Sequence, residues 1–247
     1  FTFVDELTSQ TVKVTLPGPC VLHFFGGAGN ISKVVYDDMD LFWDDIVDAF
    51  HNELAALDDA GCEYVQLDET AFAKFSDPSI QAALKERGDD WKDLLALYSD
   101  IMNRVIEGKP EGMRLGIHLC RGNKQSYWQA EGSYDLVADT LFNKINADCY
   151  FMEYDSPRAG DFSPLKFLPK NKTAILGLVS TKTPEIETGD ELKKRIEEAG
   201  KFADLDNLGL SPQCGFASDH LGNQITVDDE IAKLKLVVDT AKDIWGD

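Results

Sequence analysis

Short apolar runs alternate with longer amphipathic stretches along the whole 247-residue chain. The runs are rich in Val, Ile, Leu, Tyr and Phe and lack clean alternation, which is typical of strands covered on both faces of a parallel sheet. The predicted strands are residues 11–16 continuing into 20–25, then 63–67, 114–118, 149–153, 173–179 and 208–211. This pattern indicates an α/β protein.

Five amphipathic stretches between and after these strands are predicted to be helices, at residues 40–59, 91–106, 133–145, 190–202 and 227–245. Gly61 follows the first, and Gly108 with Pro110 follows the second, and these residue types commonly end helices. Strands that alternate with helices favour a parallel sheet with right-handed crossovers.

A (β/α)8 barrel (TIM barrel) explains the polar residues better than a doubly wound sheet. Gly26-Gly27-Ala28-Gly29 lacks the glycine spacing of a dinucleotide fingerprint. Reactive side chains instead follow several strands, where barrel enzymes keep their active sites. Only about six strand–helix units are present, so we expect one barrel domain over residues 1–247 that lacks its first two units. Its open edges are then expected to be covered by another chain or by an N-terminal segment.

Charge and cysteine content limit the possible partners. With 44 acidic and 24 basic residues, the net charge of −20 argues against nucleic-acid and membrane binding. No apolar run is long enough for a membrane span, and no secretory segment opens the chain. Five scattered cysteines, an odd number, are typical of reduced thiols in a cytoplasmic protein.

Four residues near strand ends form a candidate metal site. His118 and Cys120 stand two residues apart, so on a strand both point to one face. Glu153 and Cys214 end later strands, and one nitrogen, two sulfurs and one oxygen are a ligand set that zinc prefers. The alternative is two buried cysteines, a core histidine with an ordinary partner, and a surface glutamate.

These motifs resemble a known family. Four motifs are similar to motifs in the C-terminal barrel of cobalamin-independent methionine synthase. They are Leu67-Asp68-Glu69, His118-x-Cys120, Glu153 with Arg158, and Pro212-Gln213-Cys214-Gly215. The similarity is closer to single-domain relatives, which include epoxyalkane:coenzyme M transferases. It runs from about residue 12 to residue 245 and corresponds to strands three to eight of the family's barrel.

The resemblance implies a Zn²⁺ cofactor bound by His118, Cys120, Glu153 and Cys214. It also implies that Asp68 binds the amino group of homocysteine, with Glu69 beside it in the substrate site; the alternative for Asp68 is a helix cap. Lys182 stands where the family has a proton-donating histidine, and we expect it to be the catalytic acid.

Three further polar residues follow the strand ends that carry the expected zinc ligands. Arg121, Asn123 and Arg158 are expected to bind an anionic group of the substrate. The alternative for the arginines is a structural ion pair with Asp155 or Asp161.

The leading hypothesis is a zinc-dependent thiol alkyltransferase that moves a methyl group from a methyltetrahydrofolate-type donor to homocysteine. Two departures from the family weaken the case for folate: Lys182 replaces the histidine, and residues 24–30 lack the tryptophan that stacks on the pterin. The family's Gly-Ser-containing loop on the first strand, which binds the amino-acid carboxylate, is also not found. The alternatives are thiol addition to an epoxide and a zinc-binding homologue without catalysis.

Overall fold

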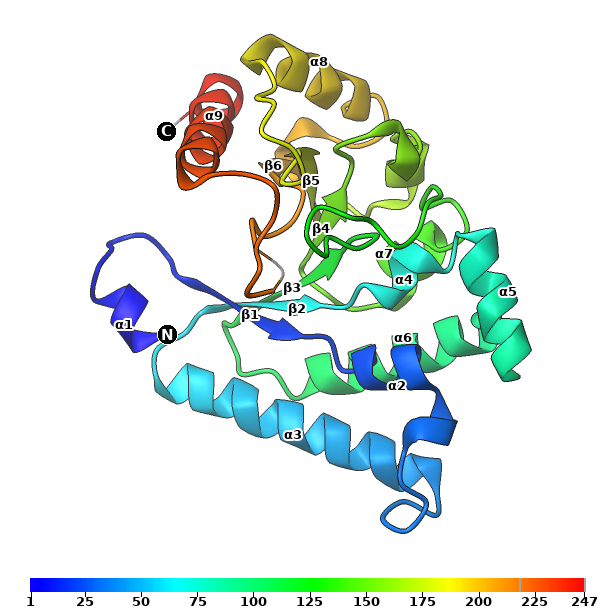
Figure 1. Ribbon diagram of the computed structural model, residues 1–247. Coiled ribbons are helices and arrows are strands. Elements are labelled where there is room, and N and C mark those ends of the chain that lie inside the picture. Colours follow the sequence, from blue (N-terminus) through cyan, green and yellow to red (C-terminus); the bar gives the residue numbers. More distant parts are fainter. Residues whose placement is uncertain (218, 247) are drawn as a thin grey trace.

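Six parallel strands form one sheet in the computed structural model, which describes residues 1–217 and 219–246. They follow one another in chain order: β1 (Lys13–Pro17), β2 (Tyr64–Asp68), β3 (Arg114–Leu119), β4 (Cys149–Glu153), β5 (Thr173–Val179) and β6 (Leu208–Pro212). The sheet curves as part of a barrel that does not close, with β1 and β6 as its edges (Figure 1). The predicted α/β barrel architecture with six strands is confirmed, whereas the covering of its edges stays a prediction.

Helices cover the outer face of this sheet. The longer ones are α3 (Met39–Asp59), α5 (Pro78–Arg87), α6 (Trp91–Glu107), α8 (Gly189–Ala199) and α9 (Val227–Trp245). The shorter ones are α1 (Thr2–Asp5), α2 (Val21–Gly26), α4 (Ala71–Lys74) and α7 (Ala138–Lys144), with 3-10 turns η1 (Ala28–Asn30), η2 (Pro157–Ala159), η3 (Ser163–Phe167) and η4 (Leu205–Asn207). Helix α3 packs beside α6, and α9 lies against β6 (Figure 1). No helix within the described residues is long and apolar enough to cross a membrane.

The ends of the helices follow from local side chains. Helix α9 has the predicted bounds, because Thr226 and Asp229 form a reciprocal capping box at its start. Helix α3 ends two residues before Gly61, whose φ of 90° lies in the left-handed region that glycine adopts without strain.

The predicted strand at 20–25 is wrong, because these residues lie largely in helix α2. Pro17-Gly18-Pro19 ends β1, since proline has no N–H to continue a ladder, and Phe24 N then donates to Cys20 O at 2.8 Å. A short apolar run does not by itself distinguish a strand from a buried helix.

Two helical segments also differ from the prediction. Helix α5 was not predicted; Asp77 caps its first turn and Pro78 opens it. The stretch 133–145 is helical only in α7, because the residues before α7 form a loop. The Tyr134 hydroxyl holds this loop in place, since it donates to Leu119 O at 3.0 Å and accepts from Glu153 N at 2.9 Å. Tyr134 thereby ties together the carboxyl ends of β3 and β4.

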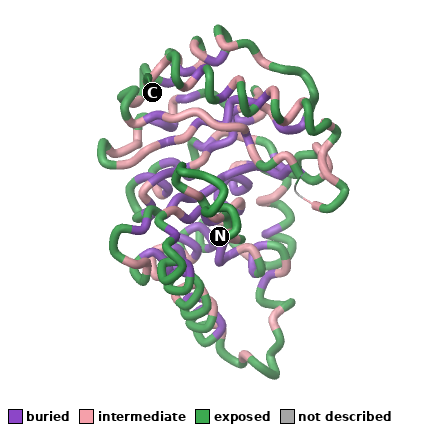
Figure 2. Tube along the Cα trace, turned by 90° about the vertical axis from the view of Figure 1, so that its left-hand side faces the viewer, coloured by how far each residue is buried: buried purple, intermediate pink, exposed green. Residues whose placement is uncertain are grey.

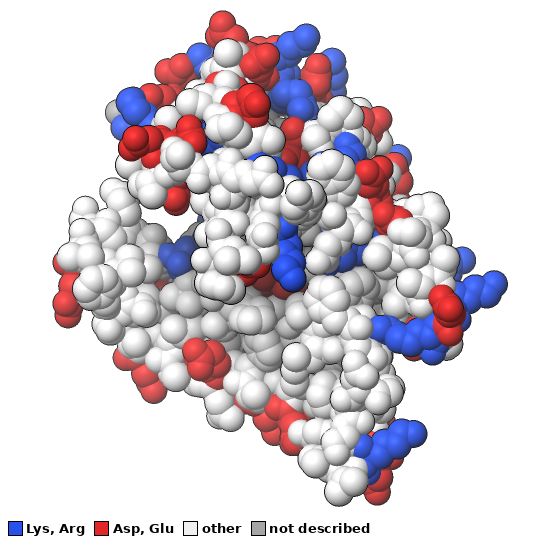
Figure 3. All heavy atoms as spheres, in the orientation of Figure 1, with Lys and Arg blue, Asp and Glu red and all other residues white. Residues whose placement is uncertain are grey.

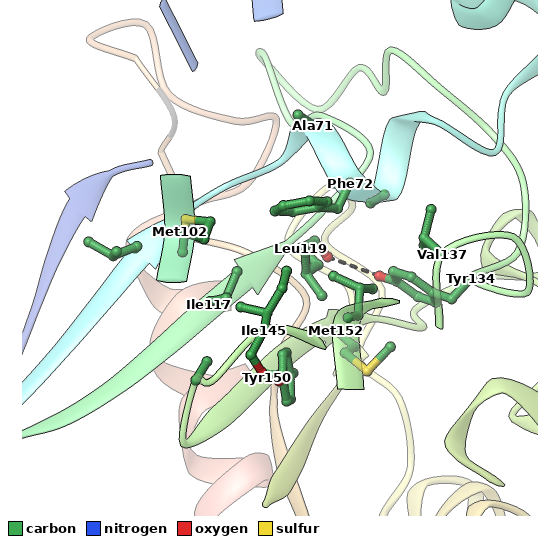
Figure 4. Close-up of a cluster of buried hydrophobic side chains, with 14 of the residues drawn as sticks. Ala71, Phe72, Met102, Ile117, Leu119, Tyr134, Val137, Ile145, Tyr150 and Met152 are labelled. Carbon is green, nitrogen blue, oxygen red and sulfur yellow. Dashed lines mark hydrogen bonds between the residues drawn. The ribbon is translucent and has the colours of Figure 1, made fainter. Parts of the chain in front are cut away.

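The main core lies between the sheet and its helices. Side chains of β3 and β4 point outward into it, where they meet residues of α4, α6 and the segments around α7 (Figure 4). The tube in Figure 2 is accordingly buried through its centre and exposed along the outer helices. Because side chains alternate along a strand, His118, between the outward-pointing Ile117 and Leu119, faces the barrel interior.

Candidate metal centre

The carboxyl ends of the strands bring the candidate ligands together. Asp68 ends β2 and pairs in register with His118 of β3, and Cys120 follows β3 directly. Cys214 follows β6, the last strand in chain order. The ligand atoms of His118, Cys120 and Cys214 all lie within 4.8 Å of one another.

These three side chains have the chemistry of a metal site. His118 Nε2 is buried and has no hydrogen-bond partner among the described residues outside the cluster, where the Cys120 and Cys214 sulfurs lie beside the ring. A buried nitrogen without a partner is costly unless something else binds it. One imidazole nitrogen and two sulfurs are donors that suit zinc, so the residues present fit the expected ion.

The charges within the cluster are strongly coupled. A hydrogen bond with Cys214 and the neighbouring His118 outweigh burial and hold the pKa of Cys120 well below its ordinary value. The same hydrogen bond, together with burial, raises the pKa of Cys214. Burial lowers the pKa of His118, but the charge on Cys120 and the hydrogen bond to Asp68 raise it well above the ordinary value. The protonation states of the three side chains are therefore linked to one another.

Asp68 binds the other ring nitrogen of His118. Its Oδ1 lies 3.0 Å from His118 Nδ1 and accepts a hydrogen bond from Gln66 Nε2 at 2.7 Å. Lys13 Nζ in turn donates to Gln66 Oε1 at 2.6 Å. A carboxylate on Nδ1 orients the ring and leaves Nε2 available to a metal.

Glu153 does not lie in the three-residue cluster. Its carboxylate is fully buried, with Oε1 bound by Arg158 Nη2 at 2.5 Å and by Lys182 Nζ at 3.3 Å. Its Oε2 accepts from the backbone N of Arg121 at 2.5 Å, which holds the carboxylate beside the residue that follows Cys120. Burial would raise the pKa of Glu153, but Lys182, Arg121 and Arg158 outweigh it and lower the pKa.

Lys182 faces Glu153 rather than the cluster. Besides its contact with Glu153, its ammonium lies 3.5 Å from Asp155 Oδ2, and the side chain is 5% exposed. Lys182 and Arg158 both line a neighbouring cavity, which Asp155 and Trp128 also border. Both cations therefore contribute to the support of Glu153, and neither lines the cavity at the cluster.

Two residues expected to bind substrate are buried elsewhere. Arg121 is fully buried, lies over the Tyr134 ring at 4.2 Å and donates to Gly132 O at 2.7 Å. Glu69 is also fully buried and accepts from Cys20 N at 2.8 Å; burial raises its pKa to about 7. Because neither side chain lines the cavity, the structure does not support a substrate contact for either of them.

Asn123 does line the cavity, but its amide is already engaged. Its Nδ2 donates to Thr181 Oγ1 at 2.9 Å and to Gly215 O at 3.0 Å, and its Oδ1 accepts from Asn223 Nδ2. Asn123 thus ties the loop after Cys214 to the end of β5, which positions the third member of the cluster.

A cavity of about 620 Å³ opens over the cluster, inside the unclosed barrel. Figure 3 shows this face hollowed near its centre, with both basic and acidic side chains visible in the hollow. Three lysines, Lys13, Lys74 and Lys124, line the cavity together with Asp68. Lys74 was not predicted from the sequence; the available signal was a lysine within the apolar run Ala71-Phe72-Ala73-Lys74-Phe75, which is buried throughout.

A family model described as the catalytic domain of cobalamin-independent synthase matches residues 5–243. The chain belongs to this family. It is 39% identical to the protein YxjH of Bacillus subtilis (strain 168) in an alignment 247 residues long that covers 99% of this chain and 65% of YxjH. It is 26% identical to a methionine synthase of Pyrococcus furiosus, over 94% of this chain and 56% of that protein.

A solved structure supports the same family. The crystal structure of a putative vitamin-B12 independent methionine synthase from Listeria monocytogenes matches with a TM-score of 0.77 and 33% identity. The match covers 100% of this chain and 69% of that one. The chain thus spans about two thirds of the length of YxjH and of the Listeria protein.

Proposed function

We propose that this protein is a zinc-dependent thiol alkyltransferase, which transfers a methyl group from a methyltetrahydrofolate-type donor to homocysteine. The observation that carries the proposal is the cluster of His118, Cys120 and Cys214 under an open cavity, with His118 Nε2 buried and without a hydrogen-bond partner among the described residues outside the cluster. Membership of the cobalamin-independent synthase family supports it.

His118, Cys120 and Cys214 are the proposed zinc ligands, and Glu153 is the proposed fourth, held next to Cys120 by the backbone of Arg121. Zinc at this place would keep a substrate thiol deprotonated near neutral pH. Asp68 orients His118 through Oδ1 and lines the cavity, and its other carboxylate oxygen, Oδ2, is the proposed contact for the substrate ammonium.

The reaction is a nucleophilic displacement at carbon. The thiol first loses its proton to the solvent, and a sulfur lone pair then forms the new bond to the methyl carbon. The bond from that carbon to the donor nitrogen breaks, and the nitrogen keeps the electron pair and takes up a proton from the solvent. We assign Lys182 a positioning role through Glu153, because its ammonium is bound to Glu153 and Asp155.

Proton release and product formation together test the proposal. Zinc-loaded protein mixed with homocysteine in weak buffer should release about one proton per chain, since the thiol binds as thiolate. Addition of methyltetrahydropteroyl-triglutamate should then give methionine, detected by mass spectrometry. Proton release without methionine, but with a thioether formed from an epoxide, would favour the epoxide reaction. Absence of both proton release and product would contradict an alkyltransferase.

A further inference from the structure

The cavity over the cluster is basic, although the protein is acidic overall. The net charge of the chain is −20. Among the described residues that line the cavity, three lysines face a single carboxylate, Asp68, which is already bonded to His118. A basic hollow in a protein of this charge favours an anionic ligand.

Lys74 is the most deeply placed of these lysines. It ends the short helix α4 and is 2% exposed. Its Nζ donates to Gln129 Oε1 at 3.0 Å and lies 4.7 Å from the ring centre of Phe25 and 5.5 Å from that of Phe24. An ammonium has three donors, so this arrangement leaves donors for a further acceptor.

Lys74 differs from the other buried lysines of the described chain in having no carboxylate partner. Three lysines are buried in the described part of the chain: Lys74, Lys182 and Lys233. Lys182 lies 3.3 Å from Glu153, and Lys233 lies 3.1 Å from Glu187. Lys74 has no carboxylate within 4.0 Å among the described residues. Because a buried charge is costly unless it is paired, Lys74 lacks the anion that the other two have.

The electrostatics around Lys74 agree with a missing anion. Burial lowers its pKa, and the acidic groups at Cys120, Glu69 and Glu153 only partly oppose this effect. An anion bound at Lys74 would act in the same direction as these groups and would favour the charged ammonium.

We propose that Lys74 binds an oxyanion of the thiol substrate, a carboxylate or a sulfonate, while the sulfur of that substrate lies at His118, Cys120 and Cys214. The inference rests on the proposed function and adds the residue that binds the acid group of the substrate. Lys74 and Asp68 line the same cavity, so an amino acid thiol would place its carboxylate and its ammonium against opposite charges.

Three small thiols test this assignment on protein loaded with Co²⁺ in place of zinc, whose absorption reports a bound thiolate. The probes are neutral 2-mercaptoethanol, 3-mercaptopropionate and 2-mercaptoethanesulfonate. We expect at least one of the two anionic thiols to bind about tenfold or more tightly than the neutral thiol, as a charge-assisted hydrogen bond implies. The arm that shows the preference identifies the oxyanion as a carboxylate or a sulfonate.

Variants then assign the preference to Lys74. Lys74→Gln should remove it and leave the affinity for 2-mercaptoethanol within about twofold, whereas Lys74→Arg should retain most of it. Lys124→Gln, which removes an exposed lysine of the same cavity, is the matched control and should retain the preference. Circular dichroism and a thermal melt check that each variant folds. If Lys74→Gln does not fold, the comparison of neutral and anionic thiols is made on the unmodified protein and on Lys74→Arg.

Equal binding of neutral and anionic thiols by the unmodified protein, or a preference that survives Lys74→Gln, would overturn the role of Lys74 while leaving the proposed function in place. If none of the three thiols changes the cobalt spectrum, the proposed function fails and the role of Lys74 falls with it.

Discussion

Replacement of Asp68 by Asn should weaken zinc binding without removing any proposed ligand. Asp68 Oδ1 lies 3.0 Å from His118 Nδ1 and also accepts from Gln66 at 2.7 Å. The negative charge makes the imidazole a better donor to a metal and fixes the ring with Nε2 toward the two cysteines. An asparagine side chain keeps an acceptor atom but loses that charge.

The size of the effect follows from the position of Asp68. Loss of an outer carboxylate behind a metal-binding histidine generally lowers metal affinity by about 10–100-fold. The Asp68 side chain is 38% exposed, so solvent screens part of its charge and we expect a loss near the lower limit, about tenfold. A tenfold loss corresponds to about 1.4 kcal/mol of binding free energy.

Competition with a chromogenic chelator measures this change. Zinc-loaded protein, Asp68→Asn and the control Asp37→Asn, which removes an exposed carboxylate before α3, are titrated with the chelator at constant ionic strength. The control should retain the affinity of the unmodified protein. An Asp68→Asn protein with unchanged zinc affinity and an unchanged melting temperature would refute the argument that Asp68 supports His118 as a ligand.

Two further changes probe the cluster and its surroundings. Cys214→Ser should lower zinc affinity by about 100-fold or more, because an alcohol replaces a soft thiolate; metal analysis after dialysis measures it, and full retention of zinc would exclude Cys214 as a ligand. Glu69→Gln should flatten the pH dependence of stability. Burial raises the Glu69 pKa from 4.5 to about 7. The contribution of the protonated Glu69 carboxyl to the free energy of unfolding is therefore fully present below about pH 4.5, and about 3 kcal/mol of it is lost as the pH rises from there through 7. Urea unfolding of both proteins at about pH 5 and about pH 8 measures the difference, and equal losses of stability would contradict this role of burial.

The strands and the main helices could be predicted from the sequence because apolar periodicity reports burial directly. The segment 20–25 could not, since five apolar residues around His23 fit a strand or a buried helix equally well, and the distinction depends on the break at Pro17-Gly18-Pro19. The loop before α7 could not be predicted either, because it depends on tertiary contacts. Two hydrogen bonds of the Tyr134 hydroxyl, with Leu119 O and Glu153 N, hold this stretch in a loop.

The residues of the candidate site could be predicted only in part from the sequence. The spacing of His118 and Cys120 predicts a shared face, and barrel topology brings Cys214 to the same place. The partners of Glu153 are not encoded by spacing, because Arg121, Arg158 and Lys182 reach it from three different segments. A search of the sequence for reactive residues at strand ends also misses Lys74, which lies in a buried helix after the strand.

X-ray absorption at the zinc edge counts the sulfur atoms bound to the metal. We expect about two sulfur neighbours at about 2.3 Å in the zinc-loaded protein, from Cys120 and Cys214. With homocysteine added, we expect three, because the substrate thiolate joins them. A sulfur count that stays the same with and without homocysteine would contradict activation of the thiol at this site, and zinc surrounded only by oxygen and nitrogen would contradict the cluster itself.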